Sequence, residues 1–179
     1  MVFRDGDSSG APRVDFMVSD RLTPEALAGM LFMLRQTVVF PWESVEQVVR
    51  EYCKDDLGDP HTPGTAAWHM RHIIEIFRQH ARVIMLGLNE KPSQVDGAIA
   101  SLDGVAWTGL DAARDTLLAD VDAFIKWAAE LPADALDRPF AYGKETNLAK
   151  MIACMSVHIT WHAAAVHYWC RWKKPAQPK

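Results

Sequence analysis

The sequence has few cysteines and no strong excess of charge of either sign. Three cysteines among 179 residues are too few, and odd in number, for a disulfide scaffold, so we expect a reducing, cytoplasmic environment. The 19 basic and 23 acidic residues leave a net charge of −4, which argues against a basic nucleic-acid binder. Because 49% of the residues are hydrophobic, the composition favours a single folded domain over a disordered chain.

Several short catalytic motifs are missing as well. No Glu is followed three residues later by His, which argues against a ferritin-type di-iron centre. The sequence also has no His-Glu-x-x-His zinc motif and no Cys-x-x-Cys pair. Any metal or catalytic site must therefore be built from residues that are more widely separated in the chain.

One long segment, residues 151–170, has no Asp, Glu, Lys or Arg and is long enough to cross a bilayer. It nevertheless carries three histidines, and polar groups are costly at bilayer depth. We therefore interpret it as a buried helix of a soluble bundle, and we expect no membrane partner.

Apolar side chains recur at gaps of three and four residues in four segments, and no alternating run predicts a strand. The expected helices cover residues 23–55, 65–88, 110–131 and 146–172. Pro41 should kink or interrupt the first of them. Thr23, Thr65 and Thr146 are the expected starts. The predicted fold is an all-α four-helix bundle.

Three connecting or terminal segments complete this scheme. A long, turn-rich connection over 89–109 would return the chain so that the second and third helices run parallel. We expect the bundle to span residues 21–173, between an N-terminal arm (1–20) and a short C-terminal tail (174–179).

Histidines occupy positions where a bundle core normally carries apolar side chains. His158 and His162 are one turn apart, about 40° around the helix axis and about 6 Å along it. His72 lies on the inner stripe of the second helix, with His69 one turn before it. A buried imidazole must form a hydrogen bond or bind a ligand, and converging imidazoles are good ligands for zinc, nickel, copper or ferrous iron. The pattern by itself leaves metal binding and hydrogen-bonded core histidines both open.

Two segments resemble a known family. GTAAWHMRHIIEIFRQH (64–80) and MSVHITWHAAAVHYW (155–169) resemble the helix-two motif and the closing His-x-x-x-His helix of the DinB-like superfamily. That superfamily includes the YfiT-type metal-dependent hydrolases and the bacillithiol and mycothiol S-transferases. The resemblance extends from about Leu22 to Trp172. Many members follow the last histidine with Arg-Gly-Gln, and here Ala163–Ala165 stand instead, which leaves the subfamily and the substrate open.

The resemblance implies a four-helix bundle that holds a divalent metal, zinc or nickel, with His72, His158 and His162. It implies a metal-dependent enzyme of stress response or detoxification that activates water or a low-molecular-weight thiol against a small-molecule electrophile. It also implies a homodimer. The sequence offers no basic stripe, so we expect no nucleic-acid partner. The alternative is a non-catalytic dimeric bundle whose metal site is structural or vacant.

Individual residues carry further alternatives. His69 competes with His72 for the ligand position, and we favour it as a residue that supports a ligand. Glu75 is the candidate general base, or else an ion-pair partner of Arg71 or Arg78.

Other side chains have both a functional and a packing interpretation. Cys154 is either a packing residue or a nucleophile paired with His158, and Trp68 and Trp161 are either pocket walls or core.

The remaining histidines lie outside the predicted site. His80 and His167 are expected at the surface or an interface, because they lie away from the inner stripes. His61 falls in a loop with no partner evident from the sequence.

Overall fold

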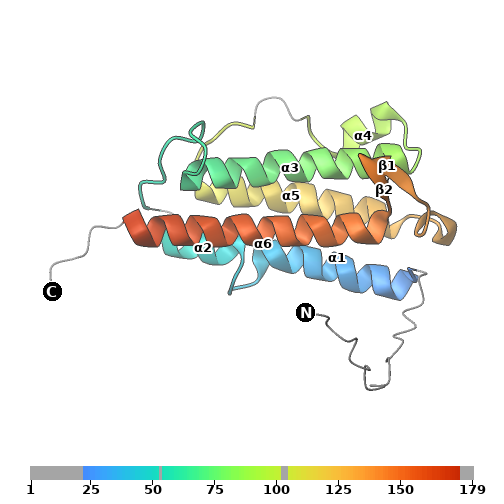
Figure 1. The fold of residues 1–179 in the computed structure, drawn as a ribbon, viewed down its shortest axis with the longest axis horizontal. Helices are drawn as coiled ribbons and strands as arrows, with labels where there is room; N and C mark the ends of the chain where they lie inside the picture. The colour runs from blue at the N-terminus through green and yellow to red at the C-terminus, as the bar shows by residue number, and fades with distance from the viewer. Residues whose placement is uncertain (1–21, 53, 102–104, 174–179) are drawn as a thin grey trace, which may run out of the picture.

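The computed structural model describes residues 22–52, 54–101 and 105–173, in which helices dominate (Figure 1). The predicted arm (1–20) and tail (174–179) lie outside the described residues. The helices are α1 (Pro24–Val39), α2 (Val45–Tyr52), α3 (Ala66–Gly87), α4 (Pro92–Ala98), α5 (Leu110–Ala129) and α6 (Leu148–Lys173). The short elements are η1 (Ala133–Ala135), β1 (Phe140–Tyr142) and β2 (Lys144–Thr146). The all-α prediction is confirmed, with one small hairpin added.

The first predicted helix is interrupted near Pro41, as expected. The Thr23 hydroxyl accepts a hydrogen bond from the backbone N–H of Ala26 and caps α1. The helix ends at Val39, and Pro41 cannot donate the backbone hydrogen bond that would continue it. The chain resumes as α2 at Val45, so the two pieces together form one side of the bundle.

Four helical rods surround the core: α3, α5, α6, and α1 together with α2. In Figure 1, α3, α5 and α6 run side by side, and α1 and α2 follow one another along α6. Contacts join α6 to α3 and to α1, and join α5 to the same two helices, so the rods occupy the four corners of a bundle. Figure 1 also shows α3 and α5 running in the same direction, as the long connection predicted. No helix in the described part of the chain is long and apolar enough to cross a membrane.

Each rod contributes large apolar side chains to one continuous core. Leu34 of α1, Phe77 of α3, Phe124 of α5 and Ile159 of α6 are all buried. The rings of Phe77 and Phe124 meet edge to face, with centroids 6.0 Å apart. Burial of these apolar faces is the main force that holds the four rods together.

The two longer connections contain structure that the sequence pattern did not reveal. The stretch between the third and fourth expected helices forms η1 and the antiparallel hairpin, in which Phe140 pairs with Thr146. Three-residue strands are too short to display an alternating pattern, which explains why they were missed. Within the connection after α3, α4 buries Val95, and Ile99 directly follows it into the core.

The predicted start of α6 at Thr146 is wrong. Thr146 belongs to β2, where its backbone pairs with Phe140. The capping side chain is Asn147, whose Oδ1 accepts a hydrogen bond from the backbone N–H of Lys150 at 3.0 Å. Pairing in the hairpin thus moves the helix start beyond the threonine.

Candidate metal centre

Three histidines from two helices converge on one point between α3 and α6. Each of His72, His158 and His162 offers one ring nitrogen, and the three nitrogens lie within 4.8 Å of one another. The ring centroids of His158 and His162 are 4.5 Å apart, and that of His72 is 4.8 Å from His162. His162 is only 2% exposed, whereas the other two rings are half-buried. Such a group could hold a divalent metal ion.

The protonation state of these rings suits metal binding. Burial, together with repulsion from His158, His69 and His72, lowers the pKa of His162 to about 3. Burial likewise lowers the pKa of His72 and of His158. The rings are therefore neutral at pH 7, which is the form that coordinates a metal.

An unsatisfied nitrogen provides an independent test of the fit. Nε2 of His158 is buried and forms no hydrogen bond with any residue that the structure describes. A buried polar atom without a partner is costly, and a bound cation would satisfy it. Three imidazole nitrogens are also a donor set that zinc and nickel accept. The residues present therefore fit a divalent transition metal.

His69 lies beside this group. Its Nδ1 is 2.7 Å from Nδ1 of His162. The contact uses one nitrogen of His162 and leaves Nε2 of the same ring for another ligand. The structure thus brings His72, and not His69, into the group of three, and places His69 as a support for His162.

Two tryptophans enclose the histidines. The indole of Trp68 is stacked on the His72 ring, with centroids 4.7 Å apart and an interplanar angle of 10°. Trp161 meets His162 edge-on at 4.5 Å. Trp161 is 62% exposed and lines two hollows, one shared with His69 and one shared with His158. Trp161 therefore forms a wall at the surface rather than part of the core.

Glu75 lies one turn after His72 and is ion-paired. Its Oε1 is 3.0 Å from Nε of Arg71. Its negative charge partly offsets the burial that lowers the pKa of His72. The ion pair considered from the sequence is therefore formed, and the carboxylate is close enough to the centre to influence it electrostatically.

The expected surface position of His80 is wrong. The ring is buried, its Nε2 lies 3.1 Å from the Tyr142 hydroxyl, and its centroid is 6.3 Å from that of His158. Tyr142 belongs to the unpredicted hairpin, which covers this part of α3. The sequence periodicity of α3 could not reveal a partner outside the bundle.

The structure also shows the surroundings of Cys154 and of the two histidines that lie farther from the centre. Cys154 is exposed rather than packed in the core, and it lines a shallow hollow with His158 and Trp161. His167 is half-buried and contacts the hydroxyl of Tyr52 at 3.1 Å. His61, as expected, lies in a loop, where Nδ1 is 2.6 Å from Arg71.

A comparison with protein-family models matches residues 39–166 to the DinB superfamily, a range that contains all three histidines. The chain belongs to the DinB superfamily. Comparisons with curated proteins and with solved structures found no match. For this DinB protein, the resemblance inferred from the two histidine-bearing segments is therefore confirmed, together with the helical fold.

Proposed function

We propose that this DinB protein is a metal-dependent enzyme whose zinc or nickel ion is held by His72, His158 and His162. The observation that carries the proposal is the number of ligands. The group in the described part of the chain comprises three imidazoles. Structural zinc sites normally use four protein ligands, whereas catalytic sites use three and keep one position for water or substrate.

The surrounding residues have distinct roles in this proposal. A bound ion would supply Lewis acidity, which favours the deprotonated, nucleophilic form of water or a thiol. His69 holds the His162 ring in place, and Trp68 restrains His72 by stacking. Glu75 accepts the proton that the nucleophile loses, in competition with Arg71 for its carboxylate.

The reaction that we propose is a transfer to a small electrophile. The oxygen of water or the sulfur of a low-molecular-weight thiol forms a bond to the electrophilic carbon. The leaving group departs with the electron pair of the broken bond. The two hollows beside Trp161 give small molecules access to the neighbourhood of His158 and His69.

Metal analysis tests the first step. Purified wild-type protein is expected to bind about one zinc or nickel ion per chain, and His72→Ala, His158→Ala and His162→Ala should each lose it. His61→Ala, a histidine in an exposed loop, is the control and should retain it. Full retention of metal by all three ligand variants would reject the proposal.

The catalytic step needs its own assay. Turnover of 1-chloro-2,4-dinitrobenzene with cysteine should be measured before and after chelation with EDTA and after metal is restored. Metal binding without any turnover of thiol and electrophile, and without hydrolysis of activated esters, would favour the non-catalytic alternative. The homodimer stays a prediction, which light scattering would check.

A further inference from the structure

A separate groove lies on the other side of α6, between its C-terminal half and α2. It encloses about 1050 Å³, a size suited to a small-molecule ligand. None of the three metal-site histidines lines it. Ala164, Tyr168 and Trp172 line both this groove and the hollow beside His69 and Trp161, so the two hollows adjoin without sharing a metal-site histidine.

The floor and one wall of the groove are apolar. Val48 of α2 and Ala163 of α6 are buried beneath it, and Ala164 is small enough to leave space above. Tyr168 and Trp172 form a wall, with ring centroids 5.5 Å apart, and they are 62% and 73% exposed. A ligand with an apolar body would cover both rings and remove their apolar surface from water.

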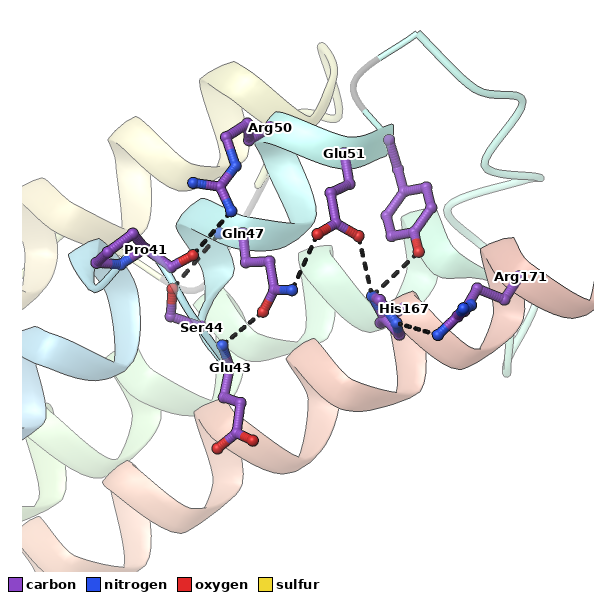
Figure 2. Close-up of polar contacts among 9 residues, drawn as sticks. Pro41, Glu43, Ser44, Gln47, Arg50, Glu51, His167 and Arg171 are labelled. Atoms are coloured by element: carbon purple, nitrogen blue, oxygen red, sulfur yellow. Dashed lines mark hydrogen bonds and ion pairs between the residues drawn. The ribbon is translucent and has the colours of Figure 1, made fainter.

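One end of the groove carries a positive charge, the guanidinium of Arg171. Within the described part of the chain, no carboxylate forms an ion pair with Arg171, and its Nη1 lies 3.5 Å from Nε2 of His167. The other nitrogen of His167 faces Glu51 at 3.5 Å and the Tyr52 hydroxyl at 3.1 Å. Figure 2 shows His167 between Glu51 and Arg171. The imidazole keeps the carboxylate away from the guanidinium, which remains available at the groove.

The network behind His167 is itself held in place. Gln47 donates from Nε2 to the Glu51 carboxylate at 2.9 Å, and its Oε1 accepts from the backbone N–H of Glu43 (Figure 2). The Gln47 bond also lowers the pKa of Glu51 and keeps it ionised. The Glu51 carboxylate therefore contacts Gln47 of α2 and His167 of α6, and it does not line the groove.

A negative charge lies farther along the groove. Glu43 also lines it, and Figure 2 shows its carboxylate over the middle of α6, well away from Arg171. The backbone of Glu43 has φ 50°, in the left-handed region. An anionic group would be attracted to the Arg171 end and repelled from the Glu43 end.

From this arrangement we infer that the groove binds a small amphipathic monoanion, a carboxylate on an apolar chain. Its anionic group pairs with Arg171, and its body lies on Val48 and Ala163 beside Trp172. The apolar lining excludes small, fully hydrated anions, and Glu43 excludes a second acidic group at the far end. None of the candidate metal ligands lines the site, so binding there does not require the metal ion.

Calorimetric titration of the full chain with decanoate tests this inference. One decanoate is expected to bind per chain, equally well with EDTA and with zinc. Arg171→Gln should weaken binding about tenfold, the size expected for loss of one charged hydrogen bond. The control is Arg138→Gln, which removes an exposed cation near the hairpin that is paired with Asp134, and it should leave binding unchanged.

A second comparison tests the role of Glu43. Decanedioate, which has the same chain length and two carboxylates, should bind about tenfold more weakly than decanoate, and Glu43→Gln should close that gap. Unfolding curves for each variant would show that the fold is intact.

Four results would overturn the inference. These are equal decanoate affinity in wild type and Arg171→Gln, equal affinity for decanoate and decanedioate in wild type, binding that EDTA abolishes, and absence of binding. If decanoate failed to bind and Trp172→Ala converted a dimer to a monomer, the groove would be an interface between two copies instead.

Discussion

Nδ1 of His69 lies 2.7 Å from Nδ1 of His162, so that an imidazole of α3 fixes the orientation of an imidazole of α6. At this distance one nitrogen carries the proton and the other accepts it. The contact turns Nε2 of His162 toward a different partner. Histidines that bind metals regularly donate their second ring N–H to a neighbouring acceptor, which holds the ligand ring and raises its basicity, and His69 is in position to be that acceptor for His162.

Removal of that support should weaken metal binding without abolishing it. His69→Ala is expected to reduce zinc affinity about 10- to 100-fold. His69→Gln, which keeps a hydrogen-bonding group, should lose less. Competition with a chromophoric chelator would measure both. A loss as complete as that of His162→Ala would instead identify His69 as a ligand.

The metal-free protein should lose stability as the pH falls below 6.5. The unfolded chain protonates His162 near its ordinary pKa of 6.5, whereas the folded chain does so only near 3. Between these values the unfolded state binds more protons, so the free energy of unfolding falls by up to about 1.4 kcal/mol per pH unit for this ring. Urea unfolding in EDTA at pH 7, 6 and 5 would measure the slope. His162→Gln should have a smaller slope, and an unchanged slope would contradict the prediction.

Replacing only one partner of the buried ion pair between α3 and α5 should strongly lower the free energy of unfolding. Nε of Arg78 is 2.6 Å from Oδ2 of Asp120, and the two side chains are 11% and 10% exposed. Burial raises the pKa of Asp120, and Arg78 opposes that rise. Arg78→Met or Asp120→Leu alone should reduce the free energy of unfolding by about 3–5 kcal/mol. The double variant should lose much less, and additive losses in urea unfolding would show that the two charges are not coupled.

The packing of the hairpin on α3 depends on a glycine. A Cβ added to Gly87 would lie 2.7 Å from Cγ of Phe140, so Gly87→Ala should destabilise the protein by about 1–3 kcal/mol. In a Phe140→Ala background, which removes the clashing ring, Gly87→Ala should lower the free energy of unfolding by less than it does in the wild type. Gly29→Ala, in α1 with open space around it, is the matched control and should stabilise by up to about 1 kcal/mol. Thermal unfolding would compare them, and a stabilised Gly87→Ala would contradict the close approach.

The helical periodicity predicted much of the group of three histidines that forms the candidate metal centre. Because a helix has 3.6 residues per turn, the spacing of His158 and His162 places them on one face, and the apolar stripe of α3 carries His72 to the same interior. The sequence leaves open whether His69 or His72 joins His158 and His162, because both lie on that stripe. The answer depends on the relative rotation of α3 and α6, which is set by packing along the whole bundle.

Other features left no signal in the local sequence. His80 is buried because Tyr142 reaches it from a hairpin some sixty residues later in the chain. Cys154 is exposed because it lies on a face of α6 that the helices described by the structure leave open to solvent. His167 lies between Arg171 and Glu51, and its contact with Glu51 joins two helices far apart in sequence.

The sequence by itself determined the class of fold, the break at Pro41 and the membership of the DinB superfamily. Each of these follows from local periodicity, backbone chemistry or short motifs. Only the tertiary structure decided which imidazoles meet, which nitrogen of His158 is left without a partner, and where the groove beside α2 opens. These features depend on distances between helices, which arise from the simultaneous packing of all four rods around one core.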